Sequence, residues 1–492
     1  MRPLNKIVIG CIWIAFMGTS CKKALDLAPI SSISSANFWK TESDATGALY
    51  GMYVDFRGVT ATNLFLWGEA RSQDIKQSIG NDYTNLPIFT NILTPVTAGP
   101  DWTSLYKVIN DANLILKNVP TINFTTEANK NTILGQAYAM RAYCYFVAVR
   151  TWGGVPIVTD PTEGYNPSTM YKERSTPEEV FTQIKSDIQT ALSLFADNSY
   201  PKGRNLWSKP AVYALKGDVF LWTAKMLNGG VSDFKASLDA LNAVDSSDVT
   251  LLADFASIFD YTNKGNKEII MASNYELNQS GGTFMVNLSC GKIPPNASPA
   301  AVAAIGTPGG ESYWTLTDDT RRSFTDDDQR KAASFVELYT KDPTTGLYTN
   351  LYECVQEKFD GMINAGTRTF IDDVILYRYA DILLLKAEAE NALGMDPSDA
   401  INLVRQRAYG ANFSQHIFIS GSKAQNDAAI LNERLLELLY EGKRWWDILR
   451  FGKAFDLIAY FKSNPNAQHE LLWPLSNNIL SLEPKVTQNP GY

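Results

Sequence analysis

Histidine and cysteine are scarce in this sequence of 492 residues. It has two histidines, His416 and His469, and five cysteines. The histidines lack the spacing of metal ligands and no C-x-x-C pair occurs, so we expect no metal site. Removal of a signal peptide ending before Cys21 would leave four cysteines, and lipidation of Cys21 would leave three. At most one disulfide could then form, so the hydrophobic core must hold the fold.

Dense basic runs and the motifs of common enzymes are absent as well. Net charge is −8, whereas nucleic-acid-binding proteins carry basic patches, so we expect no nucleic acid as a partner. No G-x-S-x-G, P-loop or dinucleotide-binding motif stands in context, and the acidic run 325–330 lacks EF-hand spacing. We therefore expect no cofactor and no catalytic residues. The two carboxylates of a glycoside hydrolase are not excluded by counting 52 acids.

The first twenty residues have the composition of a secretory signal peptide. Arg2 and Lys6 precede eleven mostly apolar residues, 7–17, a run too short to span a bilayer. Small residues then lead to Cys21, as in a bacterial lipobox, whose cysteine is lipidated. We predict cleavage after residue 20 and lipidation of Cys21; the alternative is an ordinary signal peptide with Cys21 incidental. No second apolar run is long enough to cross a membrane, so the body is expected to be exported and tethered.

Helical periodicity dominates the rest of the chain. Thr41 and Asp44 have capping-box spacing at the start of an apolar stripe over 41–56. Apolar residues recur at steps of three and four over 101–119 and 134–152, which predicts amphipathic helices rather than strands.

Three segments resemble one another, and each is followed by a loop and a second amphipathic helix. All three contain an apolar residue, a basic residue and a small residue in succession, and a small residue lets a paired helix approach closely. The pattern predicts helix-turn-helix hairpins of the tetratricopeptide kind. The first helices are 139–149, 214–224 and 384–394, and the second helices are 177–195, 232–244 and 396–408.

Two long connections interrupt the helical pattern. Residues 153–177 are rich in turn formers and are expected to wrap the helical body. Residues 281–310 hold six glycines and four prolines, which argues against regular helix there. Long irregular loops in compact proteins are often functional, so this second loop is expected to help build a binding face.

The segment 432–453, "NERLLELLYEGKRWWDILRFGK", is predicted as one core-facing helix, because apolar residues recur at steps of three and four. Trp445 and Trp446, like Trp102, are assigned to the core. Gly442 is unfavourable inside a helix by about 1 kcal/mol, so a packing reason is expected for it. Charged residues three apart are expected to pair on the surface, each pair contributing roughly 0.2–0.5 kcal/mol; a catalytic role for them is the lesser alternative. These pairs are Arg434 with Glu437, Glu441 with Arg444, and Arg444 with Asp447.

Five stretches give the chain a resemblance to the SusD/RagB family of outer-membrane lipoproteins. They occur in the family's order and span nearly the whole mature chain, and the last ends in Asn489-Pro490-Gly491-Tyr492. The stretches are 25–45, 141–158, 377–394, 432–453 and 470–492.

The resemblance implies a mostly α fold, with four tetratricopeptide-like helical hairpins, long irregular loops and little β-structure. It also implies a lipid anchor on the outer face of the outer membrane, no catalytic activity, and a SusC-like TonB-dependent transporter as partner, to which the protein delivers a nutrient. The expected divisions are a signal peptide (1–20), an N-terminal helical region (21–250), a variable loop-rich region with the ligand face (251–374) and a C-terminal helical region (375–492).

Candidate ligand contacts follow from the chemistry of saccharides. Aromatic rings stack on the apolar faces of sugars, while Asp, Asn and Arg bond their hydroxyls. Exposed loop aromatics in a polar setting are therefore the residues to seek, with core packing as the competing interpretation for each. The predicted ligand-binding residues are Trp67, Arg71, Asp74, Asn81, Tyr83, Tyr313, Trp314 and Asp318.

Three functions remain open from the sequence. The first is capture of a nutrient, most simply an oligosaccharide, for the transporter. The second is a peptide-binding protein or a purely structural lid of the transporter without glycan affinity. A glycoside hydrolase ranks below both.

Overall fold

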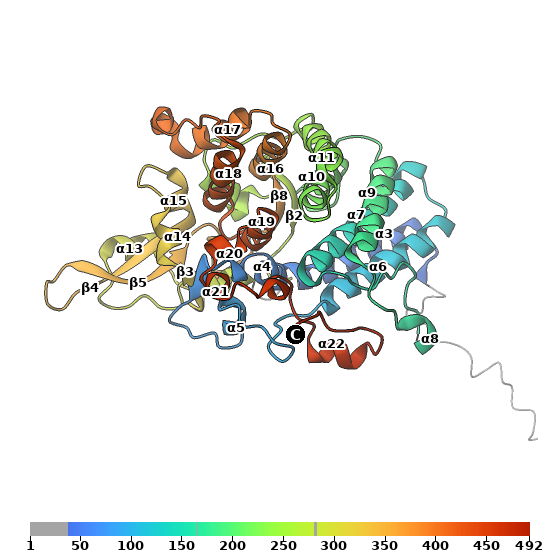
Figure 1. The fold of residues 1–492 in the computed structure, drawn as a ribbon, viewed down its shortest axis with the longest axis horizontal. Coiled ribbons are helices and arrows are strands. Elements are labelled where there is room, and N and C mark those ends of the chain that lie inside the picture. The colour runs from blue at the N-terminus through green and yellow to red at the C-terminus, as the bar shows by residue number, and fades with distance from the viewer. Residues whose placement is uncertain (1–37, 165, 280–282) are drawn as a thin grey trace, which may run out of the picture.

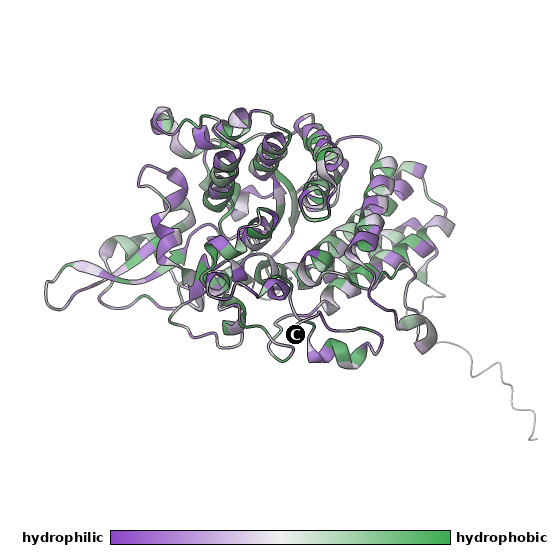
Figure 2. Ribbon diagram, in the orientation of Figure 1, coloured by the Kyte–Doolittle hydropathy of each residue, from purple (hydrophilic) through white to green (hydrophobic). Residues whose placement is uncertain are grey.

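The computed structural model describes residues 38–164, 166–279 and 283–492. The predicted signal peptide and Cys21 lie outside these residues. The described chain is mostly helical, as predicted, and its β-structure is limited to short two-stranded sheets (Figure 1). Hydrophobic and hydrophilic residues alternate along the helices (Figure 2), as amphipathic helices in a packed body require.

Four pairs of packed helices form the body of the described chain, as the resemblance implied. Successive pairs also contact one another, because α6 packs on α7, α9 on α10, and α11 on α16. A further helix, α18 (Lys423–Leu438), packs on α16. The pairs are α3 (Glu42–Thr60) with α6 (Thr103–Asn118), α7 (Glu127–Trp152) with α9 (Pro177–Leu194), α10 (Lys209–Met226) with α11 (Gly230–Asp245), and α16 (Tyr379–Ala392) with α17 (Ser398–Tyr409).

Local sequence explains where these helices begin and how closely they pack. Thr41 forms the predicted capping box with Asp44, and Thr176 forms another at the start of α9. At Gly217, one of the predicted small residues, an added Cβ would lie 2.4 Å from the side chain of Leu241. The glycine therefore allows α10 and α11 to approach.

Short helices and strands complete the described chain. The short helices are α4 (Asn63–Gly68), α5 (Leu86–Phe89), α8 (Pro167–Met170), α12 (Phe284–Leu288), α13 (Pro299–Ile305), α14 (Asp318–Arg322), α15 (Gln329–Ser334), α19 (Arg444–Arg450), α20 (Ala454–Leu457), α21 (Ala459–Ser463) and α22 (Asn477–Leu482), with 3₁₀ turns at Ala70–Ser72, Val119–Thr121, Ala256–Ile258, Tyr261–Asn263, Gly410–Gln415 and Gln468–Leu471. The antiparallel sheets are β1 (Ile75–Gln77) with β3 (Trp314–Leu316), β2 (Ile269–Ser273) with β8 (Val374–Arg378), β4 (Phe335–Lys341) with β5 (Tyr348–Gln356), and β6 (Met362–Asn364) with β7 (Thr367–Thr369).

The two predicted loops differ in outcome. The 153–177 connection lies along α6 and α7, where the hydroxyl of Tyr145 donates to the carbonyl of Val158 over 2.9 Å. The prediction that 281–310 contains no regular helix is wrong, because α12 and α13 form within this segment. Its glycines and prolines lie mostly between these two helices and beyond the second, and Pro299 occupies the first position of α13, where proline is well tolerated.

The predicted single helix over 432–453 is also wrong, because the chain breaks at residues 439–443 between α18 and α19. Tyr440 and Gly442 have φ angles of 68° and 70° there, a region that glycine adopts readily. An added Cβ on Gly68 would lie 1.9 Å from the carbonyl oxygen of Gly442. The packing reason for Gly442 is thus a tight turn pressed against α4.

Cationic side chains hold this turn by bonding the last carbonyls of α18. Lys358 donates to the carbonyl oxygens of Glu437 and Leu439 (3.1 and 2.9 Å), and Arg378 donates to that of Glu437 (2.6 Å). Cations at a helix C-terminus are favourable because they meet unsatisfied carbonyls. The helix therefore ends at a site that the sequence pattern within 432–453 does not reveal.

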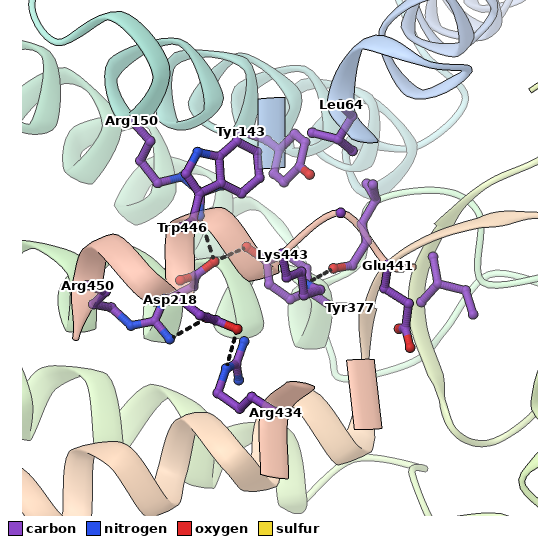
Figure 3. A pocket seen from close by; sticks show the side chains of 14 residues that line it. Leu64, Tyr143, Arg150, Asp218, Tyr377, Arg434, Glu441, Lys443, Trp446 and Arg450 are labelled. Carbon is purple, nitrogen blue, oxygen red and sulfur yellow. Dashed lines mark hydrogen bonds and ion pairs between the residues drawn. The ribbon is translucent and has the colours of Figure 1, made fainter. Parts of the chain in front are cut away.

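Most charged residues of 432–453 are buried in ion networks, which corrects the prediction of surface pairs. Arg434 bonds Asp381 and Asp447, both at 2.8 Å, and Arg450 bonds Glu388 at 2.8 Å. All five side chains are almost completely buried. Figure 3 shows part of this network around Trp446. The assignment of Trp102, Trp445 and Trp446 to the core is confirmed.

Candidate functional site

A hollow of about 480 Å³ opens beside the β1–β3 sheet. It brings together the end of β1, the glycine- and proline-rich loop and the β4–β5 hairpin, which are far apart in the sequence. We call it the β1–β3 hollow. Its lining residues are Ile79, Gly80, Gly291, Lys292, Pro294, Pro295, Gly310, Glu311, Ser312 and Tyr352.

Closely packed backbone forms the floor of the β1–β3 hollow. The backbone N–H groups of Ser78 and Gly80 donate to the carbonyls of Tyr313 and Ser312 over 2.8 and 2.7 Å, which extends the β1–β3 pairing. A Cβ on Gly80 would lie 2.3 Å from a backbone oxygen of Glu311. Glycine is therefore required at this position, because any side chain would push the two segments apart.

A buried carboxylate ties the floor together. Glu353 accepts hydrogen bonds from the hydroxyls of Ser78 and Ser312 at 3.1 and 3.0 Å. Burial raises the pKa of the Glu353 carboxyl above its usual value. The ionisable side chains exposed at the rim are Lys292 and Glu311, so among the described lining residues the accessible charges balance.

Tyr352 is an aromatic residue of the site that the sequence analysis missed. Leu338 pairs with Glu353 and Tyr339 pairs with Leu351, so Tyr352 is the extra residue of a β-bulge. Bulges redirect a side chain and are frequent next to functional sites. Tyr352 is 39% exposed and lines the hollow. The signal that could have found it is the content of strand-forming residues in 348–356, namely Tyr348, Thr349, Tyr352 and Val355.

Three predicted ligand-binding residues are neighbours of Gly80, which lines the β1–β3 hollow. Asn81 and Tyr83 follow Gly80 and are exposed, and Tyr83 is 73% exposed. The half-buried ring of Tyr313 lies against Gly80, where an added Cβ would approach it to 2.6 Å. Their contact with a ligand stays a prediction.

Trp314 does not reach the surface, so the expectation that it is an exposed loop aromatic is wrong. Its side chain is 0% exposed, and its ring stacks with Phe65 at 5.5 Å. The indole N–H donates to the carboxylate of Asp82 over 2.9 Å, and Asp82 also accepts from the side chain of Asn85. Trp314 therefore supports the loop that carries Asn81 and Tyr83 from beneath.

Trp67 and Arg71 are likewise fully buried, which corrects their expected exposure. The indole of Trp67 donates to the carbonyl of Pro100 over 2.9 Å. The guanidinium of Arg71 lies 4.5 Å from the ring centre of Trp445 and donates to Asn91 over 2.8 Å. The polar neighbours of both residues in the sequence suggested a surface, whereas the structure uses them for anchoring.

Asp74 and Asp318 are already engaged by protein groups. Asp74 accepts from Arg444 and from the hydroxyl of Thr320, both at 3.0 Å. Asp318 is exposed and pairs with Arg321 at 2.9 Å. None of the eight predicted residues lines the β1–β3 hollow itself. Tyr313 packs against its lining residue Gly80, Asn81 and Tyr83 follow Gly80 in the chain, and the other five are supports or a surface pair.

A larger cavity of about 950 Å³ lies between α6, the 156–172 connection and α22, and the sequence analysis did not anticipate it. Charged residues of both signs line it, among them Lys107, Glu163 and Lys172. Its aromatic lining residues are Trp102, which is buried, and Tyr106, whose hydroxyl donates to a backbone carbonyl over 2.5 Å. Among the described residues that line it, neither aromatic ring is as exposed as that of Tyr352, because Trp102 is buried and Tyr106 is half-buried.

The polar pocket in Figure 3 has a structural role. Its volume of about 20 Å³ accommodates one water molecule. Arg150 lies 3.9 Å from the ring centre of Trp446 and 3.6 Å from Asp218, so the pocket joins α7 and α10 to α19.

Within 38–164, 166–279 and 283–492, no group of three or more His, Cys, Asp or Glu side chains could hold a metal ion. In that part of the chain, no helix combines the length and apolar character needed to cross a bilayer.

Stacked helical hairpins that carry an open surface hollow define a helical-repeat binding protein. The family model described as "SusD family" matches residues 311–492, and the model described as "Starch-binding associating with outer membrane" matches residues 58–221. The chain belongs to the SusD family, which confirms the resemblance.

Similar proteins support this assignment over the full length. SusD-like protein P38 of Formosa agariphila is 28% identical, and the alignment covers all of both chains. Among solved structures, B. fragilis NanU is 32% identical, with a TM-score of 0.82 over 95% of this chain and 100% of that one. A SusD superfamily protein of Bacteroides vulgatus is 31% identical, with a TM-score of 0.83 over 92% and 100%.

Proposed function

We propose that this protein captures an oligosaccharide in the β1–β3 hollow and delivers it to a SusC-like TonB-dependent transporter of the outer membrane. The observation that carries the proposal is the exposed ring of Tyr352 in an open hollow with a polar backbone floor, next to which the chain continues from the lining residue Gly80 into the exposed residues Asn81 and Tyr83. Exposed rings can stack on the flat faces of sugars, and amides can bond hydroxyls. The outer-membrane, starch-binding description of one matching family model agrees with a saccharide ligand.

The proposal includes a lipid anchor on Cys21, which would hold the protein on the extracellular face of the outer membrane. The support is the order of charged, apolar and small residues before Cys21 in the sequence.

The proposed role is binding without catalysis. Hydrolysis of a glycosidic bond needs two carboxylic groups across a cleft. Glu311 is the one carboxylate among the described lining residues of the hollow, and nearby Glu353 is bonded by two serine hydroxyls. Release of reducing sugar by the pure protein would overturn this part of the proposal.

A glycan array followed by calorimetric titration tests the site, using the soluble body that begins after Cys21. Tyr83→Ala and Tyr352→Ala are each expected to weaken binding roughly 2- to 10-fold, which corresponds to the ~0.5–1.5 kcal/mol of one aromatic stacking contact. Tyr50→Ala is the matched control, because Tyr50 is a 54% exposed tyrosine on α3. Equal affinity of all three variants would place the ligand elsewhere.

The charged cavity beside α6 favours a peptide as the second candidate ligand. Lys107, Lys172, Glu163 and Glu483 line it, and such groups can pair with the charges of a peptide. Binding of peptides but of no glycan would favour this reading. Absence of both affinities would favour a purely structural lid of the transporter.

A further inference from the structure

The charged side chains around the pocket of Figure 3 include one more cation than carboxylates. Their ion pairs, 2.6 to 3.6 Å long, join α7, α10, α16, α18, α19 and the turn before α19. Each of these side chains is at most 15% exposed. Among the described residues, the five cations are Arg150, Lys225, Arg434, Lys443 and Arg450. The four carboxylates are Asp218, Asp381, Glu388 and Asp447.

The neighbouring charge network is balanced and serves as a comparison within the same molecule. Among the described residues it joins five cations to five carboxylates. Glu441 lines the pocket of Figure 3 as well, but Lys358 and Arg378 bind it at 2.7 Å each, so its charge is already compensated. The cations are Arg330, Lys358, Arg378, Arg405 and Arg407, and the carboxylates are Glu268, Asp328, Glu433, Glu437 and Glu441.

Arg150 leaves most of its donors without a protein acceptor. Among the described residues, its one hydrogen bond runs from Nε to the carbonyl of Phe146 over 3.3 Å, and the Asp218 carboxylate lies 3.6 Å from Nη1, beyond hydrogen-bond distance. The ring centres of Phe146 and Trp446 lie 3.7 and 3.9 Å from Cζ. Ring faces attract the charge, but the five N–H donors of a guanidinium lie in its plane and need acceptors there. The Nη groups are therefore available to an acceptor in the pocket that Arg150 lines.

Two carboxylates that line the same pocket are engaged by protein groups. Asp447 is bound by Arg434 and Arg450 at 2.8 Å each. Asp218 accepts a hydrogen bond from the hydroxyl of Tyr377 over 3.0 Å. The excess positive charge of the network is therefore left for a further anion.

We propose that the pocket of Figure 3 binds a monatomic anion, chloride or another halide, beside Arg150. The pocket volume of about 20 Å³ corresponds to one water molecule, so a halide fits, whereas phosphate and carboxylate ligands are too large. A halide accepts several N–H bonds and neutralises the excess charge, whereas a water molecule brings no charge. This inference does not depend on the proposed function.

Urea unfolding of the full-length protein in sodium chloride and in sodium gluconate tests the anion site in solution. Gluconate is too large for the pocket, and equal ionic strength keeps the screening of surface charges the same in both salts. The anion binds the folded state only. The unfolding equilibrium constant is therefore expected to fall about ten-fold when chloride reaches about ten times its dissociation constant. The same unfolding constant in both salts at every concentration would overturn the proposal.

Arg150→Met separates a specific site from a general salt effect. The substitution removes the donors and leaves four cations with four carboxylates, so stability should be equal in chloride and gluconate. Arg141→Met is the matched control, because Arg141 is an equally buried arginine of α7, and neither it nor its partner Asp187 lines the pocket. This control should lower stability in both salts and keep the ten-fold effect of chloride. A chloride effect that persists in Arg150→Met, or that disappears in Arg141→Met, refutes the site.

Diffraction from crystals soaked in sodium bromide locates the anion directly, and it needs the wild-type protein alone. Bromide replaces chloride and scatters anomalously at the bromine absorption edge. The expected result is an anomalous peak in the pocket, within hydrogen-bond distance of the Arg150 Nη atoms. An ordered water molecule at that position without anomalous signal, or bromide bound at the protein surface only, would show that the pocket is not an anion site.

Discussion

Replacement of Arg378 by methionine tests the buried charge network that holds the C-terminal helices. Arg378 is fully buried and makes five hydrogen bonds: two to the Glu441 carboxylate, one each to the Glu268 and Glu437 carboxylates, and one to the Glu437 carbonyl. Methionine fills similar space and removes the charge and every donor. The change therefore isolates the electrostatic contribution.

The expected loss of stability is large because the partners remain buried. Glu437 keeps Arg330 and Arg407, and Glu441 keeps Lys358, but each carboxylate loses its contact with Arg378. Removing one member of a buried ion network typically lowers the free energy of unfolding by ~3–5 kcal/mol. Urea unfolding at pH 7, followed by far-ultraviolet circular dichroism, measures it.

Arg322→Met is the matched control. The Arg322 side chain is 63% exposed and pairs with Asp318 at 3.7 Å. Exposed pairs of this kind contribute at most about 1 kcal/mol. A similar effect of both substitutions, or a loss below about 1 kcal/mol for Arg378→Met, would refute the view that this network holds the turn at 439–443.

The pH dependence provides a second check. Burial alone would raise the pKa of the Glu437 carboxyl. The guanidinium groups beside it outweigh this effect and lower its pKa below the usual value. A lowered folded-state pKa gives stability that is present above the unfolded-state pKa, about 4.3 for Glu, and is lost as pH falls towards the folded-state value. In Arg378→Met less positive charge surrounds the Glu437 and Glu441 carboxylates, so they take up protons at a higher pH than in the wild type. The stability difference between variant and wild type should therefore shrink between pH 7 and pH 4.

Two further predictions concern single residues outside this network. Trp314→Ala is expected to lower the free energy of unfolding by ~3–5 kcal/mol, because the ring is fully buried; urea unfolding with little change would show that the ring is exposed in solution. Cys21→Ala is expected to abolish incorporation of a labelled fatty acid and to release the protein from the membrane fraction. Continued labelling of Cys21→Ala would exclude lipidation at that residue.

Local signals made the helical part of the fold predictable. Thr41 with Asp44, and the steps of three and four over 101–119 and 134–152, each concern residues within one or two helical turns. The corresponding helices α3, α6 and α7 form as expected. Gly217 shows that a small residue inside a helix can indicate where a second helix packs closely against it.

Long-range contacts explain the errors. The break between α18 and α19 depends on Lys358, Arg378 and α4, none of which lies in the 432–453 segment. The burial of Trp314 depends on Phe65, and Tyr352 reaches the hollow through a bulge in the register with β4. Periodicity within one segment carries no information about such partners, so it cannot distinguish a supporting tryptophan from a stacking one.

A second set of charged side chains fixes the sheet beneath the β1–β3 hollow. Glu69 accepts backbone N–H bonds from Lys443 and Arg444 (3.0 and 3.2 Å), which fixes the start of α19. Arg444 bonds Asp74 at 3.0 Å, and the carbonyl of Asp74 accepts from the N–H of Thr317, also at 3.0 Å. Asp74 directly precedes β1 and Thr317 directly follows β3. The sheet beneath the hollow is therefore joined through Arg444 to the start of α19, at the point where its strands begin and end. The floor of the hollow is already ordered when the chain folds. Binding of a ligand therefore does not have to offset a loss of conformational entropy in the floor.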